Sequence, residues 1–247
     1  MNSTDHFLQS AVIQFRDDTP FSTEFDDFYF SSDYGPQETD YIYLQRNDLR
    51  RRWSSPAENK DTAFIIAETG FGTGLNFICA WHLWNALNIN QRQLHYVAVE
   101  KHPVSKADLA RALSRWPQLA GYTEALLAVY PPLSPGTHTV FPQVQTAQST
   151  VKLTLIFNDA SEALSTLHTH VDAWFLDGFT PSRNPDMWSE ALFKEVARLS
   201  RPGSTFATFT SAGIVRRSLQ GVGFKVEKQP GLGLKREMCF GTFVEQP

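Results

Sequence analysis

The chain has 247 residues, of which 42% are hydrophobic and 19% charged, and its formal net charge is −4. This length suits one large domain or a domain with an appendage, and the hydrophobic share supplies a core. With two cysteines, no Cys/His group at metal-ligand spacing, no apolar run approaching 18 residues and no secretion signal at the N-terminus, we expect a cytoplasmic protein without a disulfide framework, a metal or a membrane span.

Residues 1–60 are predicted to form an N-terminal β extension. Two short aromatic runs, at residues 25–30 and 41–44, flank a segment that contains a Gly-Pro turn. Two such runs around a turn indicate a β-hairpin. The polar stretch from residue 50 to 62 is expected to connect the hairpin to a Rossmann-like domain at residues 61–247.

A glycine-rich turn follows the first predicted strand of that domain, at residues 63–67. Glu68 is the first residue of this turn, which contains Gly70, Gly72 and Gly74. An apolar pattern at helical spacing follows. This context is typical of nucleotide binding, because glycines admit a close ligand and a helix N-terminus offers free N–H groups. The spacing departs from that of dinucleotide sites. Glu68 instead favours a ligand with an ammonium group, such as the methionine end of S-adenosylmethionine, and a structural tight turn is the alternative.

Three further strand-like runs also end in acidic residues. Residues 94–99 end in Glu100, placed to hold ribose hydroxyls, and residues 153–157 end in Asn158 and Asp159, placed for an adenine amino group. The run at residues 173–176 ends in Asp177. Because ligands of open α/β sheets bind beyond the carboxyl ends of the strands, these acids indicate a nucleoside ligand. Asp177 taken alone is equally a helix cap or a solvated turn residue, and for the four acids together the alternative is four solvated turns.

The remaining elements continue the alternation of strands and helices that predicts a parallel sheet. Within residues 117–150 we expect one helix, near 124–130, and a loop. The later expected elements are a helix at 189–199, a strand at 204–210, a short helix at 214–219, and closing strands at 225–228 and 238–244.

Basic residues are concentrated toward the C-terminus. Residues 181–240 contain 10 Lys or Arg and 5 Asp or Glu, although the whole chain is acidic. The basic pairs in this stretch are Arg216-Arg217 and Lys235-Arg236. A one-sided basic surface is compatible with binding a phosphate backbone, and an ordinary solvated face is the alternative.

Several of these segments resemble the methyltransferase domain of the MnmC family of bifunctional tRNA modification enzymes. They are ETGFGTGLNF, LDGFTPSRNPDMW, RPGSTFATFTSAGIVRRSLQ, GLGLKREM and STEFDDFYFSSDYGPQETDYIYL, which together span nearly the whole chain. The resemblance implies an α/β, class I S-adenosylmethionine-dependent methyltransferase fold with strand order 3-2-1-4-5-7-6, in which the seventh strand is antiparallel. It also implies methylation of 5-aminomethyl-2-thiouridine at the tRNA wobble position, giving 5-methylaminomethyl-2-thiouridine.

In two-domain members of that family an FAD-dependent oxidase follows the methyltransferase. No second glycine fingerprint occurs in this chain, so FAD is expected only if such a domain is fused or supplied by a partner. The sequence leaves open whether the chain stands alone or belongs to a longer protein.

Asp177 is the candidate catalytic residue under this interpretation. It is expected either to accept a proton from the protonated aminomethyl group or to hold the amine while solvent takes the proton. Phe179 is expected to stack on the uracil ring of the anticodon loop. Asn184 and Trp188 are expected to shape the pocket, and capping of the next helix by Asn184 or Asp186 is an equal alternative.

Two other classes of function remain open. One is an S-adenosylmethionine-dependent methyltransferase that acts on another small amine or on a protein, against which the basic C-terminal stretch argues weakly. The other is a non-catalytic nucleoside-binding module. The presence of Asp177 within the intact segment LDGFTPSRNPDMW argues against this function.

Overall fold

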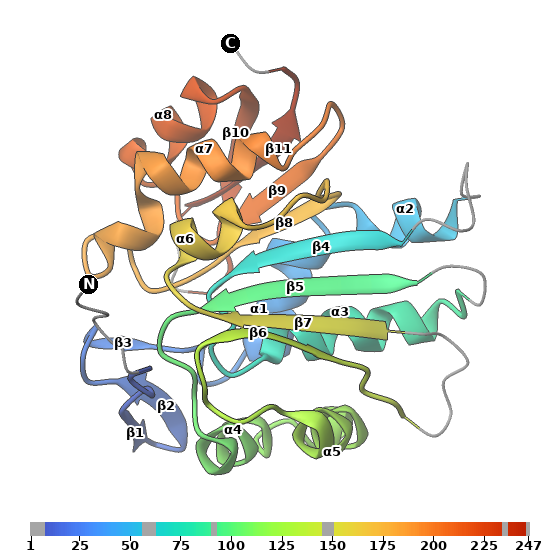
Figure 1. Cartoon of the computed structure of the whole chain (residues 1–247), viewed down its shortest axis with the longest axis vertical. Helices are drawn as coiled ribbons and strands as arrows, with labels where there is room; N and C mark the ends of the chain where they lie inside the picture. Colours follow the sequence, from blue (N-terminus) through green and yellow to red (C-terminus); the bar gives the residue numbers. More distant parts are fainter. Residues whose placement is uncertain (1–7, 56–62, 90–92, 145–150, 234–236, 246–247) are drawn as a thin grey trace, which may run out of the picture.

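The computed structural model describes residues 8–55, 63–89, 93–144, 151–233 and 237–245. Most of them build one eight-stranded sheet with helices packed on both faces (Figure 1). Its strands are β4 (Phe64–Thr69), β5 (Leu94–Glu100), β6 (Gly136–Val140), β7 (Val151–Phe157), β8 (Ala173–Leu176), β9 (Thr205–Thr208), β10 (Phe224–Pro230) and β11 (Glu237–Phe243).

The strand order confirms the fold class implied by the resemblance. The sheet runs β10-β11-β9-β8-β4-β5-β7-β6. If β4, β5 and β7 to β11 are counted as strands one to seven, this is the order 3-2-1-4-5-7-6, and β11 is antiparallel to both of its neighbours. The additional edge strand β6 pairs antiparallel with β7, where a loop was expected. That expectation was wrong because β6 is mostly exposed and lacks the apolar pattern that marks a strand.

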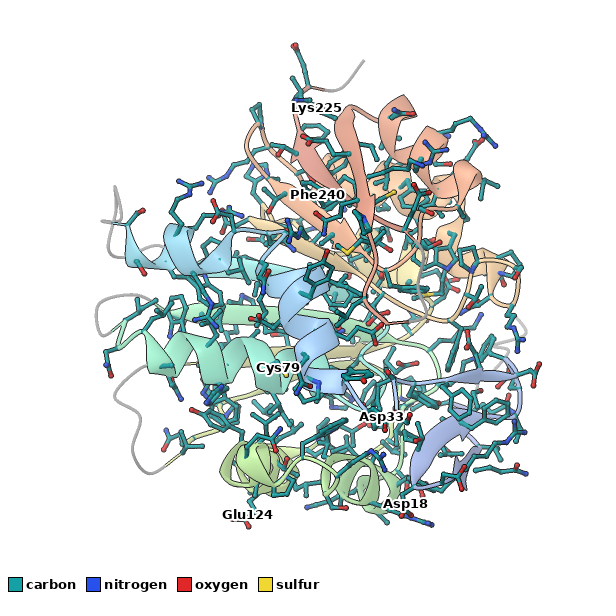
Figure 2. All side chains as sticks on the ribbon, turned by 180° about the vertical axis from the view of Figure 1, so that it is seen from behind. Asp18, Asp33, Cys79, Glu124, Lys225 and Phe240 are labelled. Carbon is teal, nitrogen blue, oxygen red and sulfur yellow. The ribbon has the colours of Figure 1, made fainter. Side chains whose placement is uncertain are left out.

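Alternate side chains of the central strands point into two separate cores. Trp174 of β8 packs with α6, α7 and α8 on one face, whereas Phe175 packs on the other. The first set of helices is α6 (Ala160–Ser165), α7 (Glu190–Arg198) and α8 (Gly213–Gly221). The other face carries α1 (Gly35–Thr39), α2 (Leu49–Ser54), α3 (Leu75–Ala86), α4 (Lys106–Leu113) and α5 (Ala120–Val129). Figure 2 shows α1 and α3 from this side, in front of the sheet.

The N-terminal extension contains the expected small antiparallel sheet, but only its third strand lies within a predicted run, at residues 25–30. Its strands are β1 (Ile13–Arg16), β2 (Thr19–Ser22) and β3 (Asp27–Phe28), paired in that order. Residues 41–44, predicted as a strand, belong to the π-helical turn η1 (Asp40–Leu44) that continues α1. Pro36 starts this helical segment, and three consecutive buried side chains then anchor it on the sheet, so tertiary packing overrides the aromatic strand pattern.

The expected connector after residue 50 is also partly helical. Residues 49–54 form α2, and Trp53 packs edge to face against Phe64 and Trp84 of the main core. Residues 56–62 lie outside the described part of the chain. Two short 3₁₀ segments complete the inventory, η2 (Pro117–Leu119) and η3 (Pro185–Trp188). Over the residues described, no helix has the length and apolar character needed to cross a membrane.

The parallel strands of the large sheet all point in the same direction, and the small sheet lies beside their carboxyl ends (Figure 1). Backbone turns and side chains that follow β4, β5, β7 and β8 are therefore gathered opposite the N-terminal extension. This arrangement places the candidate site between the carboxyl ends of the parallel strands and the N-terminal extension.

Candidate active site

A cavity of about 970 Å³ lies at the carboxyl ends of the parallel strands. Its lining residues come from the extension, within residues 19–43, from the glycine turn, from the ends of β5 and β7, and from the loop after β8. Phe209, Leu232 and Gly233 add an apolar patch from the last third of the chain. A space of this size holds a nucleoside-sized ligand together with a second group.

The glycine turn brings backbone to the cavity with no side chain in the way. Gly70, Gly72 and Gly74 have φ values of 88°, 51° and 74°, which side chains rarely adopt. A Cβ on Gly70 would lie 3.4 Å from the Cα of Gly178, and one on Gly72 would lie 3.2 Å from the Tyr29 ring. Gly70 and Gly72 line the cavity, whereas Gly74 precedes α3, and a Cβ there would meet the Phe71 ring at 2.7 Å.

Glu100 ties the end of β5 to this turn. Its Oε2 accepts a hydrogen bond from the Gly72 amide at 2.9 Å, and its Oε1 accepts one from the His102 amide at 2.8 Å. Burial raises the pKa of the Glu100 carboxyl, and these two backbone bonds oppose that rise. Each oxygen keeps a further lone pair, so the carboxylate can still accept bonds from a ribose that enters the cavity.

Asp159 both caps a helix and lines the cavity. Its Oδ1 accepts from the Ser161 amide at 3.0 Å, which caps α6, and its Oδ2 pairs with Lys101 Nζ at 3.3 Å. Asp159 therefore caps α6 through one carboxylate oxygen and still presents its carboxylate to the cavity.

Asp177 lies in the cavity wall at the end of β8 and is held from several sides. Its Oδ2 accepts from Asn76 Nδ2 at 2.7 Å, and its Oδ1 accepts from the Gly178 amide at 2.8 Å. The Thr69 hydroxyl accepts from the Asp177 amide at 3.0 Å and donates to its carbonyl at 2.8 Å. The Tyr43 hydroxyl also contacts this carboxylate, and burial followed by the Asp177 charge raises the pKa of Tyr43. The backbone and carboxylate of Asp177 are thus rigidly placed.

Glu68 lies behind the cavity wall, contrary to the expectation that it faces an ammonium group. It is 1% exposed and does not contribute to the cavity lining. Its Oε1 accepts from the same Asn76 amide that binds Asp177, again at 2.7 Å. Burial, and next the charge of Asp177, raise the pKa of Glu68 well above its ordinary value.

The loop after β8 forms an aromatic wall with the extension. Phe179 stacks on Phe25 with ring centroids 4.7 Å apart, and Tyr29 meets Phe179 edge to face at 5.1 Å. Trp188 is buried, and its Nε1 donates to the Phe179 carbonyl at 3.0 Å, so it supports the wall from the core without lining the cavity. Aromatic faces of this kind suit a flat base.

The alternative of helix capping by Asn184 or Asp186 is wrong. Asn184 precedes η3 without a side-chain cap, and Ser189 caps α7 by accepting from the Leu192 amide at 3.3 Å. Both Asn184 and Asp186 line the cavity instead. The expectation that Asn184 shapes the pocket is consistent with this placement.

Arg216 and Arg217 do not line the cavity. Arg216 and Arg217 lie on α8; Arg217 is exposed, whereas Arg216 is partly buried. Lys235 and Arg236 lie outside the described residues. Among the predicted site residues, those that the structure brings together around the cavity are Gly70, Gly72, Glu100, Asp159, Asp177, Phe179 and Asn184.

The sequence interpretation missed the side chains that complete the site. Asn76 lies within the quoted glycine motif, two residues after Gly74, but no spacing rule marks it as a hydrogen-bond donor to two acids. Tyr43 was assigned to a strand, and Phe25 and Tyr29 were assigned to a hairpin with no role in the site. Their contacts with residues more than 100 positions away leave no local signal in the sequence.

Comparisons with known proteins agree on one family. A sequence profile described as S-adenosyl-L-methionine-dependent methyltransferase matches residues 117–243. Relatives named "tRNA 5-methylaminomethyl-2-thiouridine biosynthesis bifunctional protein MnmC" are 48% identical in Methylobacillus flagellatus and 46% in Marinomonas sp., each over 96% of this chain. The chain spans only 36% and 34% of their lengths. The crystal structure of MNMC2 from Aquifex Aeolicus shares the fold, with a TM-score of 0.71, 20% identity, and coverage of 100% of this chain and 73% of that one. The resemblance to MnmC is confirmed.

Proposed function

The chain belongs to the family of S-adenosyl-L-methionine-dependent methyltransferases, and on this premise we propose that it methylates the 5-aminomethyl group of 5-aminomethyl-2-thiouridine at the tRNA wobble position. The product is 5-methylaminomethyl-2-thiouridine, the compound that appears in the name of its MnmC relatives. The proposed substrate contact is with the anticodon loop, where a single-stranded base is accessible without duplex opening.

The observation that carries the proposal is the place of Asp177 in the cavity. It lines the same cavity as Gly70, Gly72, Glu100 and Phe179. A carboxylate in this position suits an amine that meets a methyl donor, because it can bind the ammonium form and accept its proton. Asp177 is accordingly our candidate catalytic residue.

The cavity residues that we assign to cofactor binding fit S-adenosyl-L-methionine. Gly70 and Gly72 leave open a space that side chains would narrow, and Glu100 and Asp159 present acceptors toward it. We assign Glu100 to the ribose hydroxyls and Asp159 to the adenine amino group. When bound, S-adenosyl-L-methionine supplies an electrophilic methyl group on its sulfonium.

The chain's own residues then have two tasks. Asp177 holds the amine and takes up its proton, which frees the nitrogen lone pair for attack. Phe179 holds the uracil ring so that the aminomethyl group projects toward Asp177. Since methyl transfer between a neutral amine and a sulfonium builds little new charge, positioning supplies much of the rate.

Two further assignments belong to the same proposal. The MnmC relatives are bifunctional and much longer than this chain, so we propose that an FAD-dependent oxidase, fused or separate, supplies the aminomethylated tRNA. We also place the reaction in the cytoplasm, where tRNA is modified.

The test compares two anticodon stem-loops that differ only in the 5-aminomethyl group. We expect methyl transfer from labelled S-adenosyl-L-methionine to the aminomethylated loop and none to the unmodified loop. Calorimetry with S-adenosyl-L-methionine alone separates the remaining alternatives. Cofactor binding without transfer to either loop would favour another substrate, and absence of cofactor binding would refute the proposal.

A further inference from the structure

Two carboxyl groups meet at one amide beneath the cavity wall. Asn76 Nδ2 donates one hydrogen to Glu68 Oε1 and the other to Asp177 Oδ2, each over 2.7 Å. Thr39 Oγ1 donates to Asn76 Oδ1, also over 2.7 Å. The hydroxyl bond fixes the orientation of the amide, so that its nitrogen and not its oxygen faces the two acids.

The surroundings of this pair allow only one charge. Glu68 is 1% exposed, and a second buried carboxylate beside Asp177 would be strongly disfavoured. The charges that act on Glu68 include those of Asp177 and Glu100, both of them acids, and the phenol of Tyr96 is the other titratable group that acts on it. None of these groups brings a positive charge that would offset a second carboxylate.

We propose that Asn76 is a positioning residue for Asp177 and that Glu68 is its permanently protonated partner, so that the pair holds one negative charge, located on Asp177. This inference rests on the proposed function of Asp177 and adds to it the residues that set its charge and orientation. Because Glu68 Oε1 accepts from Asn76, the proton of Glu68 belongs on Oε2, and the Tyr96 hydroxyl is the polar group next to this carboxyl.

The arrangement has a direct consequence for proton transfer. A neutral Glu68 does not compete with Asp177 for the substrate ammonium, and it does not raise the basicity of Asp177 as a second anion would. The bond from Asn76 stabilises the ionised form of Asp177, which keeps the carboxylate ready to accept a proton.

The first experiment uses Asn76→Ala, with Asn85→Ala on the same helix as the matched control. We expect the rate constant for methyl transfer to fall about 10–100-fold, as expected for the loss of a bond to a charged group, while affinity for S-adenosyl-L-methionine stays within about threefold. The acidic limb of the pH–rate profile should move up by about one pH unit, because Asp177 loses a donor to its anion. A slower enzyme with an unmoved profile would mean that Asn76 has only a structural role and would overturn the proposal.

Thr39→Val is a second, milder variant that keeps Asn76 in place. It removes the bond that orients the amide, so the acidic limb should move in the same direction by a smaller amount. If Asn76→Ala fails to fold, the Thr39→Val profile still decides the matter. A profile that is unmoved, or moves toward acid, would contradict the positioning role.

The second experiment measures the protonation of Glu68 without any tRNA. In protein labelled with carbon-13 at glutamate carboxyls, the signal that disappears in Glu68→Gln should stay at a protonated position from about pH 6 to about pH 9. A signal that titrates in this range, or that is already ionised, overturns the assignment. Because this readout needs no methyl transfer, it remains decisive even if aminomethylated stem-loops prove not to be substrates.

Discussion

Hydrogen bonds hold both the backbone and the carboxylate of Asp177. Thr69 clamps its amide and carbonyl, Gly178 binds one carboxylate oxygen and Asn76 binds the other. Because two of these bonds hold the carboxylate and two hold the backbone, the side chain cannot turn away from the cavity without breaking bonds. Its position in the wall is therefore a property of the fold and does not require a bound ligand.

Replacement of Asp177 by Asn tests the proton acceptor most directly. We expect the rate of methyl transfer to fall about 10²–10⁴-fold, the usual range for general acid–base groups, with little change in cofactor affinity. Raising the pH should partly restore the rate, since more of the substrate amine is then already neutral. Asp18→Asn, the same change at the exposed turn between β1 and β2, is the control. A wild-type rate in Asp177→Asn at neutral pH would leave Asp177 as a turn residue.

His95 gives the fold a separate dependence on pH. Its Nε2 lies 3.0 Å from Thr154 Oγ1, and burial, with a smaller contribution from Lys152, lowers the pKa of His95 to about 4. The unfolded chain thus binds this proton more readily than the folded chain. The free energy of unfolding should therefore be unaffected by His95 above about pH 6.5 and should decline from there toward about pH 4.

The measurement is urea unfolding at several pH values for wild type and His95→Gln, with the exposed His168→Gln as the control. We expect His95→Gln to flatten the decline between about pH 6.5 and about pH 4. Equal slopes for wild type and His95→Gln would show that His95 does not contribute.

At the level of elements, the extension and the loop after β8 act together. Asp27 Oδ2 accepts from the Thr180 amide at 3.0 Å and from its hydroxyl at 2.7 Å, and Asp26 pairs with Arg183 at 2.5 Å. The ring of Phe25 also stacks on that of Phe179. Three consecutive residues of the extension, 25–27, therefore contact the loop after β8. The N-terminal segment is thus part of the aromatic wall.

Asp27→Ala should loosen this wall. We expect the KM for the stem-loop to rise about threefold to tenfold, because two bonds that hold the Phe179 loop are lost, while cofactor affinity remains near that of the wild type. Steady-state kinetics and calorimetry measure the two effects, and Asp18→Asn at the far side of the small sheet serves again as the control. Figure 2 shows Asp18 at the outer edge of that sheet. Equal KM values for Asp27→Ala and wild type would separate the extension from substrate binding.

The elements that could be predicted were those with a strong local pattern. The apolar strands β4, β5, β7 and β8, the glycine turn and helices α3 and α7 all follow from periodicity and turn residues. The π-helical turn η1 and the exposed strand β6 could not be predicted in this way, because packing and edge pairing decide their conformation. The same holds for the site: the acids at strand ends were recognisable, whereas Asn76 becomes significant only when α3 meets β8.

At the scale of the whole molecule, the structure separates the cavity from the basic surface. The cavity is lined by many acids, among them Glu100, Asp159 and Asp177, and these would repel a phosphate backbone that approached directly. An RNA substrate therefore requires contacts elsewhere to hold its backbone. Arg216 and Arg217 on α8 are our candidates for that role.

Neutralising that pair tests whether α8 contacts RNA. In Arg216→Gln/Arg217→Gln we expect weaker tRNA binding and a flatter dependence of log affinity on log salt, by about 0.7 per lost contact in single-stranded regions. Arg50→Gln/Arg51→Gln is the matched control, since α2 carries two exposed arginines at the opposite end of the parallel strands (Figure 1). Binding is measured by fluorescence anisotropy at several salt concentrations. A wild-type slope in the α8 variant, or an equal loss in the α2 variant, would identify Arg216 and Arg217 as ordinary solvated residues.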